Sequence, residues 1–203
     1  MAKQERAERT RTAILDAAAK VFDDHGFFGA TLSDILQHAS VTKGALYFHF
    51  QSKEQIAHAL IDEQFAVWQP LSDLPDIGVQ TVIDLTHAMA RRLQEDVRVR
   101  ASIRLVIEQG TFADPTPKAY QQWISVVESC LARAREKGDL VDGLDPNDAA
   151  TYIIGSFTGV QVSSEVLAQR TDITQRVTTM WQIVLPGLVP PRRRAKFTPE
   201  GSA

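Results

Sequence analysis

The sequence predicts an all-α protein, and three observations carry that prediction. Apolar residues recur three and four positions apart, which is the spacing of a helix with one buried face. No segment between turn residues alternates apolar and polar residues as a strand does. Proline, glycine and capping residues divide the 203-residue chain into segments of helical length. Apolar residues make up 44% of the chain, which is enough for a sizeable core.

The predicted helices follow one another with well-marked ends. Apolar stripes occupy residues 14–22, 82–93, 99–107, 120–134 and 173–188. Ser52 is predicted to start a helix, because it opens a Ser-x-x-Gln capping box. Asp145 before Pro146 predicts another start, since proline is favoured in the first turn. The helix after Pro146 is apolar on nearly all sides, which predicts burial against more than one neighbour.

Charge, cysteine content and motifs exclude several classes of function. The net charge of −3 argues against a wholly basic nucleic-acid coat but leaves room for a local basic patch. Cys130 is the single cysteine, so no intramolecular disulfide is possible. A cytoplasmic protein without a membrane span or signal peptide is expected. The five histidines have no zinc-hydrolase spacing and no glycine-rich phosphate loop is present, so no enzyme, metal or cofactor is predicted.

Residues 31–50 give the strongest functional signal. They predict two short helices joined by a tight turn at Ser40, and with the helix before them they form a helix-turn-helix. Such a unit places its second helix in the major groove of DNA. The expected DNA contacts are cations, hydroxyls, polar rings and small residues: Thr31, Thr42, Lys43, Gly44, Ala45, Tyr47, His49 and Lys53. The alternative is a helical hairpin with solvated charges, and the pattern leaves Phe48 unassigned.

Three short segments carry a family resemblance. Thr31-Leu-Ser-Asp-Ile, Val41-Thr-Lys-Gly-Ala-Leu-Tyr-Phe-His-Phe and Ser52-Lys-Glu resemble the DNA-binding signature of the TetR family of transcriptional repressors, within residues 8–60. The opening Met-Ala-Lys-Gln-Glu-Arg-Ala, the segment from Phe157 and Trp123 resemble the γ-butyrolactone receptor branch of actinobacteria. Ser40 stands where the family has glycine, and a left-handed serine costs on the order of 1 kcal/mol.

The resemblance implies an Ω-shaped homodimer that represses transcription. Its expected parts are a DNA-binding domain 1–51, a ligand-binding and dimerisation domain 52–189, and a basic, poorly ordered tail 190–203. It implies binding to palindromic operator DNA and release by a small γ-butyrolactone or butenolide, with control of antibiotic genes. The alternatives are a repressor of the same fold that answers to an antibiotic or biosynthetic intermediate, and a helical ligand-binding dimer that does not bind DNA.

The same resemblance gives candidate ligand and interface residues. Trp123 is expected to pack its indole against a lactone, although a tryptophan in an apolar stripe is otherwise typical of a core. Polar partners and walls are expected from Thr158, Gln64, Phe65, Thr86, Met89, Ile107, Tyr120, Val127 and Val162. The last two helices are expected to form the dimer interface through Gly155, Gly159, Val177, Met180, Trp181 and Val184, with an intramolecular core as the alternative.

Overall fold

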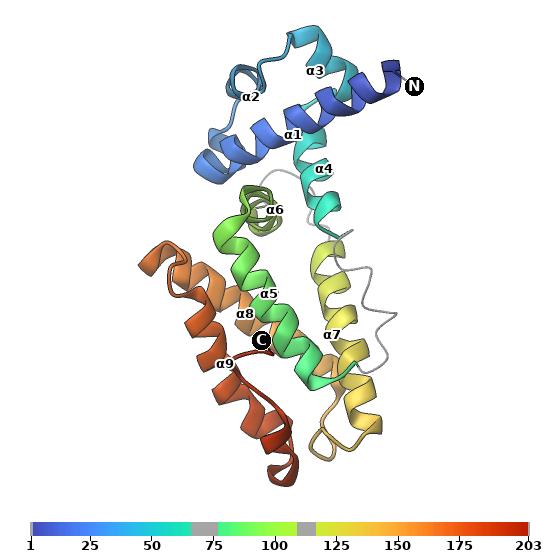
Figure 1. Ribbon diagram of the computed structural model, residues 1–203, viewed down its shortest axis with the longest axis vertical. Coiled ribbons are helices and arrows are strands. Elements are labelled where there is room, and N and C mark those ends of the chain that lie inside the picture. Colours follow the sequence, from blue (N-terminus) through green and yellow to red (C-terminus); the bar gives the residue numbers. More distant parts are fainter. Residues whose placement is uncertain (1, 66–76, 109–116, 203) are drawn as a thin grey trace. The chain divides into compact units, whose positions relative to one another are not determined.

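The computed structural model describes residues 2–65, 77–108 and 117–202 (Figure 1). Within these ranges the chain forms nine α-helices and one short 3-10 helix, with no strand, which confirms the all-α prediction. None of the described helices is both long and apolar enough to cross a membrane. The helices gather into two compact units, Met1–Gln69 with Asp96–Thr116 and Pro70–Glu95 with Pro117–Ala203.

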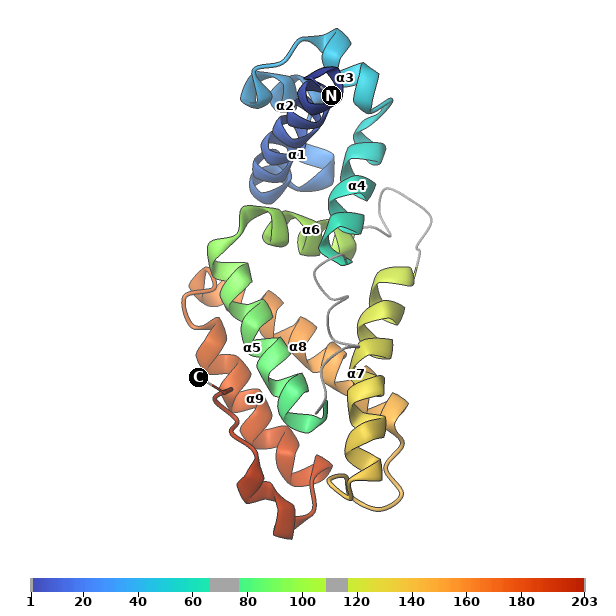
Figure 2. The same ribbon diagram turned by 45° about the vertical axis from the view of Figure 1, so that its right-hand side comes forward.

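The first unit contains five helices around one apolar core. They are α1 (Ala2–Gly29), α2 (Leu32–Ala39), α3 (Lys43–His49), α4 (Lys53–Phe65) and α6 (Val97–Glu108). The predicted stripe on α1 is buried and includes Ile14 and Phe22, and Leu46 of α3 joins the same core. Helix α6 packs against both α1 and α4, and Figure 2 shows it lying across them. The contacts therefore group α4 and α6 with the three N-terminal helices.

Local capping explains where the short helices begin. Thr31 and Asp34 form a reciprocal capping box at the start of α2, and Thr42 caps α3 by accepting a hydrogen bond from the Ala45 N–H. Ser40 ends α2 in the left-handed conformation at φ 52°, as a residue in the glycine position of this turn requires. The predicted box at Ser52 differs in one half, because Gln55 Oε1 accepts from Gln51 N–H.

A glycine bends α1 near its end. Gly26 has φ 66° and ψ −177°, so the helix is interrupted there and continues for one turn to Gly29. A Cβ at Gly26 would lie 2.8 Å from atoms of both Arg104 and Glu108. Side chains of α6 thus occupy the space that a larger residue would need.

The second unit contains the remaining helices. They are α5 (Val79–Glu95), α7 (Lys118–Glu136), α8 (Pro146–Ala168), α9 (Ile173–Leu188) and the 3-10 helix Pro191–Lys196. Asp145 caps α8 ahead of Pro146, as predicted. The large side chain of Trp181 is fully buried, and its Nε1 donates to Thr86 Oγ1 at 2.7 Å. Thr86 Oγ1 in turn donates to the Ile83 carbonyl, so this buried indole is satisfied within the unit.

The C-terminal tail is packed, which corrects the prediction that it is poorly ordered. Arg193 and Lys196 pair with Asp139 at 3.2 and 3.7 Å. Further along, the Thr198 N–H donates to Gln80 Oε1 at 2.8 Å on α5. The sequence showed a basic, proline-rich run, but its acidic and helical partners lie far away in the chain and gave no local signal.

Candidate functional site

Helix α3 is divided between an anchoring face and an exposed face. Leu46 and the following Phe50 are buried in the first unit and hold the helix in place. Lys43, Gly44 and Tyr47 are exposed on the other side. The structure therefore keeps the predicted cation, small residue and phenol on one accessible helix, as a DNA-reading face requires.

The exposed face of α3 is open and carries one internal contact. The Lys43 ammonium lies 5.8 Å from the centroid of the Tyr47 ring. Among the described residues, no atom outside the neighbouring backbone of α3 lies within 4 Å of the place where a Cβ at Gly44 would stand, so the backbone is accessible there. His49 is half-buried with its ring 5.0 Å from that of Phe48. Ala45 is half-buried, and its N–H is already bonded to the Thr42 cap.

Two predicted contacts have internal roles in this structure. Lys53 Nζ donates to the carbonyls of Phe27 and Ala30 at 2.6 and 2.7 Å and lies 4.3 Å from the Phe27 ring centroid. This ammonium caps the end of α1, and its contact with DNA stays a prediction. Thr31 Oγ1 donates to Asp34 Oδ2 at 2.6 Å, and this hydrogen bond lowers the pKa of the Asp34 carboxyl. The Lys53 partners are remote in sequence, which is why the local pattern missed them.

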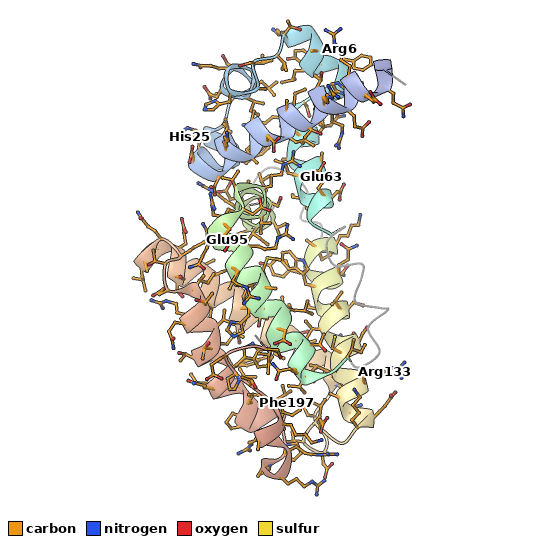
Figure 3. The ribbon with its side chains drawn as sticks, in the orientation of Figure 1. Arg6, His25, Glu63, Glu95, Arg133 and Phe197 are labelled. Carbon is orange, nitrogen blue, oxygen red and sulfur yellow. The ribbon has the colours of Figure 1, made fainter. Side chains whose placement is uncertain are left out.

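The basic N-terminal arm is similarly divided. Arg11 pairs with Glu63 at 3.0 Å, and its guanidinium lies 5.6 Å from the Phe50 ring centroid. Arg6, labelled in Figure 3, is exposed near the start of α1. Arg9 is exposed on the same helix. The arm therefore offers free-standing positive charge at its start and an internal ion pair further along.

Arginines on α6 bind the acidic side chains of the first unit, and the sequence analysis did not anticipate this. Arg98 pairs with Asp16 at 2.7 Å and with Glu63 at 2.9 Å. Arg100 pairs with Asp23 at 2.8 Å. These contacts join the first turn of α6 to α1 and α4. The signal was the repeat of arginines in Val-Arg-Val-Arg, but their partners are more than 30 residues away.

A second α6 contact reaches the bend in α1. Glu108 Oε2 accepts from the Phe27 N–H at 2.8 Å, and Glu108 Oε1 accepts from Arg104 Nε at 2.8 Å. Arg104 also donates to the carbonyl of Asp23. The bend at Gly26 is thus held by one carboxylate and one guanidinium from α6.

The predicted ligand residues fall into distinct surroundings. Trp123 is half-buried on α7, with the ring of Tyr120 edge-on at 5.1 Å. Val127 and Met89 are buried, and Thr86 is committed to the Trp181 indole. Thr158 is half-buried and donates to the Ile154 carbonyl, Val162 is exposed on α8, and Ile107 is exposed on α6 of the first unit. The side chains of Gln64 and Phe65 lie outside the described residues.

A buried amide is one residue that the sequence analysis missed. Gln161 is 3% exposed on α8, and its Oε1 has no hydrogen-bond partner among the residues that the structure describes. A buried acceptor of this kind costs stability unless something donates to it. The sequence feature that could have revealed this residue is a glutamine one turn after Phe157 in a helix that is otherwise largely apolar.

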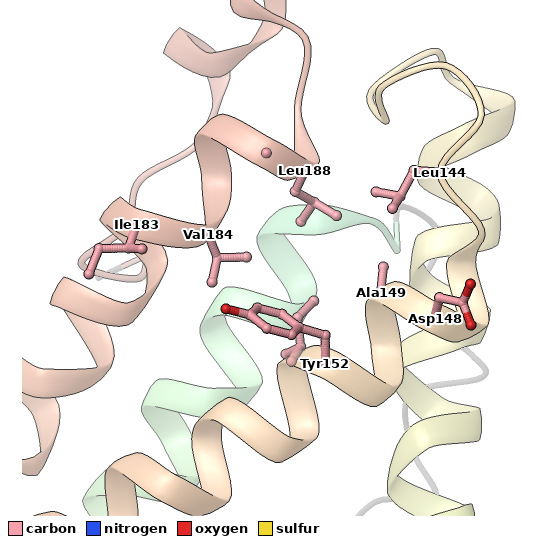
Figure 4. Close-up of a pocket in the computed structure, with 9 residues that line it drawn as sticks. Leu144, Asp148, Ala149, Tyr152, Ile183, Val184 and Leu188 are labelled. Atoms are coloured by element: carbon pink, nitrogen blue, oxygen red, sulfur yellow. The ribbon is translucent and has the colours of Figure 1, made fainter.

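A surface groove lies along α8 and α9. It has a volume of about 320 Å³ and an apolar lining (Figure 4). Tyr152 and Ile183 line it and are 63% and 70% exposed, and Val184 of the predicted interface lies between them. The full lining is Leu144, Asp148, Ala149, Tyr152, Ile153, Ile183, Val184, Gly187 and Leu188. None of the predicted ligand residues whose side chains the structure describes contributes to it.

The predicted interface residues divide between this surface and the core. Gly155 and Gly159 are exposed, with nothing within 4 Å of an added Cβ. Val177, Met180 and Trp181 are buried inside the second unit, which corrects their placement at an interface. The apolar stripe of α9 that contains Val177 and Trp181 faces its own chain, whereas Ile183 on the same helix is exposed.

Comparison with known proteins decides the family. The model for bacterial regulatory proteins of the tetR family matches residues 14–60, and the tetracyclin repressor-like C-terminal domain matches residues 77–190. The chain belongs to the TetR family. The A-factor receptor protein of Streptomyces griseus is 41% identical over 99% of this chain and 71% of its own length. This TetR-family chain is therefore a transcriptional regulator and not an enzyme.

Two solved structures of relatives have the same fold. One is a gamma-butyrolactone receptor described as ArpA-like, with TM-score 0.78 and 35% identity over 94% of each chain. The other is CprB from Streptomyces coelicolor in complex with its biological operator sequence, with TM-score 0.77 and 36% identity over 94% of each chain. The predicted helix-turn-helix and the TetR-type repressor fold are confirmed.

Proposed function

We propose that this repressor binds palindromic operator DNA as a homodimer and is released by a small γ-butyrolactone or butenolide signal, so that it controls antibiotic genes. The exposed face of α3 carries the DNA-binding half of the proposal. The similarity of the whole chain to the A-factor receptor protein, together with the half-buried Trp123, supports the proposed release by a ligand. TetR-family proteins bind operator DNA as dimers, which agrees with the symmetry that a palindrome needs.

The predicted contact residues at the exposed face of α3 each have a chemical task at the DNA. Lys43 supplies a cation for a phosphate or for the acceptor edge of guanine. Gly44 permits close approach of the backbone, and the Tyr47 hydroxyl donates to a phosphate oxygen. Thr42 is exposed while its hydroxyl caps the helix. Because phosphate contacts release counterions, affinity should fall steeply as salt rises.

The proposed ligand contacts centre on α7. The Trp123 and Tyr120 rings meet edge to face, and such a pair offers flat apolar surface to a small ring. Thr158 and Gln64 remain the polar candidates from the sequence. Thr86 is a weaker candidate, because its hydroxyl already accepts from Trp181 and donates to Ile83.

The dimer contact is proposed on the exposed surface of α8 and α9. The apolar groove, with Tyr152 and Ile183 at its edge, provides an apolar area that a second copy of the chain would bury. Gly155 and Gly159 on the same helix as Tyr152 allow close helix approach. Val184 belongs to this surface, whereas the buried α9 stripe supports it from within.

Release of DNA is proposed to pass through α6. Helix α5 ends at Glu95 and α6 begins at Val97, so a ligand-induced shift of α5 is carried along the chain into α6. The ion pairs of Arg98 and Arg100 then carry α1 and α4 with it. Shifting the population of states from 1:99 to 99:1 needs about 5.5 kcal/mol of differential ligand binding.

The test is fluorescence anisotropy with the full chain and a labelled duplex that carries the inverted repeat nearest its gene. We expect specific binding that a γ-butyrolactone or a butenolide reverses. Lys43→Ala should abolish binding without changing the thermal unfolding midpoint, and Trp123→Ala should keep DNA binding but weaken the response to ligand. Binding that neither compound reverses would refute the lactone assignment and point to an antibiotic or biosynthetic intermediate. Failure of the unchanged protein to bind would refute the whole proposal.

A further inference from the structure

Phe48 is a large apolar side chain on the exposed face of α3. It lies on α3 and is 76% exposed, although the neighbouring Leu46 and Phe50 are buried. Its ring meets the half-buried His49 edge-on, with 5.0 Å between centroids. A phenylalanine left in water on a seven-residue helix contributes little to the core, so its ring is available to a partner that meets this face of the helix.

The position of Phe48 on the helix indicates which partner. Residues four apart on a helix lie on the same side, so Phe48 is one turn above Gly44. Gly44 has open space above its backbone and is the point of closest approach in the proposed DNA complex. A helix that approaches DNA over Gly44 therefore brings the Phe48 ring with it. Tyr47, next in the chain, carries the polar contact on the same exposed surface.

The major groove offers one apolar feature to such a ring. Thymine carries a 5-methyl group there, and phenylalanine is among the side chains that contact it. A phenyl ring has no donor or acceptor for a phosphate or for the polar edges of the other bases. We propose that Phe48 is a specificity residue that packs on the 5-methyl group of a thymine in each half of the operator. This inference rests on the proposed binding of DNA by α3.

The experiment removes the methyl group from the DNA instead of the ring from the protein. Thymines of the duplex used above are replaced in symmetric pairs by deoxyuridine, which differs by that methyl alone. Anisotropy with the full chain should show a loss of about four-fold for each contacted methyl at one pair of positions and little change elsewhere. Phe48→Ala should bind the thymine duplex more weakly and show no further loss with deoxyuridine at that pair.

Phe28 provides the matched control. It is an exposed phenylalanine in the same unit, 69% exposed, but it lies at the end of α1 and not on α3. Phe28→Ala should keep the full deoxyuridine penalty. Phe48→Leu retains an apolar side chain and should keep part of that penalty, while circular dichroism confirms that both Phe48 variants fold.

The possible outcomes separate this inference from the proposed function. Normal binding by the unchanged chain with no deoxyuridine penalty at any pair would overturn the thymine contact and leave the repressor in place. Phe48→Ala that weakens every duplex equally and keeps the penalty would also overturn it, because the ring would then pack on sugar. No specific binding by the unchanged chain would overturn both proposals.

Discussion

Both units of the molecule have a buried apolar core, but ion pairs between helices are added to it at α6 of the first unit. In the first unit, Arg98 and Arg100 of α6 pair with carboxylates on α1 and α4. In the second unit, Val177 and Trp181 of α9 are buried among apolar side chains. Partly exposed ion pairs each contribute little and weaken in salt, whereas removal of a buried aromatic leaves a costly cavity. The ion pairs of the first unit can therefore be removed at a small cost each, whereas loss of the buried aromatic of the second unit costs more.

The largest predicted effect comes from the apolar unit. Trp181→Ala should lower the free energy of unfolding by about 3–5 kcal/mol, because it opens a cavity and removes the donor to Thr86. Urea unfolding followed by far-UV circular dichroism measures this loss. Trp123→Ala is the control and should cost less, since that indole is half-buried. If Trp181→Ala instead lost little stability but dissociated a dimer, the result would support the sequence-based prediction that Trp181 lies at the dimer interface.

The next effect comes from the bend in α1. Gly26→Ala should cost about 1–2 kcal/mol for the left-handed backbone alone. The added Cβ should also displace the Glu108 carboxylate from the Phe27 N–H. Thermal unfolding of the variant tests this. Gly78→Ala is the control, because its Cβ would meet the flexible end of Lys137 at 3.9 Å, and it should change stability by a few tenths of a kcal/mol. Equal effects at both glycines would contradict the proposed crowding.

A smaller effect should come from one ion pair of the first unit. Arg100 and Asp23 have side chains 21% and 15% exposed, so their coupling free energy in a double-mutant cycle should be about 1 kcal/mol. Arg133 and Glu136, at 62% and 65% exposed, should couple by no more than a few tenths of a kcal/mol. Urea unfolding at low and high salt gives both values, and the Arg100 coupling should shrink as salt rises. Similar coupling in the two pairs would contradict the view that ion pairs stabilise the packing of α6 against α1.

The sequence predicted what depends on neighbouring residues. The capping box at Thr31 and Asp34, the left-handed Ser40 and the Asp145 cap all rest on interactions within a few positions. The exposed face of α3 could be predicted in the same way, because Leu46 and Phe50 are buried and leave the other side chains of this short helix at the surface. Local rules of capping and periodicity were therefore sufficient for the fold and for much of the proposed DNA face.

What the sequence could not predict depends on distant partners. Lys53 is an ordinary surface lysine by pattern, and it becomes an internal cap because two carbonyls more than 20 residues away face it. The stripe containing Trp181 shows that one face of α9 is buried but not whether its own chain or a second copy covers it. The tail likewise depends on Asp139 and α5. Patterns give the buried face of a helix, and tertiary packing supplies its neighbour.

The smallest predicted effect tests a polar contact inside the apolar unit. Ser164 is buried and its Oγ donates to Asp172 Oδ1 at 2.6 Å, while Arg176 Nε donates to Oδ2 at 2.7 Å. The Ser164 hydrogen bond first and Arg176 second lower the pKa of the Asp172 carboxyl below its ordinary value of 3.8. A carboxyl whose pKa is lowered in the folded state stabilises that state at pH values above the unfolded pKa, and this contribution is lost as pH falls through the folded pKa.

Ser164→Ala should therefore raise the pKa of Asp172 in an NMR titration and move acid unfolding to slightly higher pH. Ser163→Ala, whose hydroxyl donates to the Val160 carbonyl, is the control and should leave the Asp172 titration unchanged. An unchanged Asp172 pKa in Ser164→Ala would assign the lowered pKa to Arg176 instead. The contact tested in the second unit would then be an ion pair, of the same kind as those that join α6 to its neighbours in the first unit.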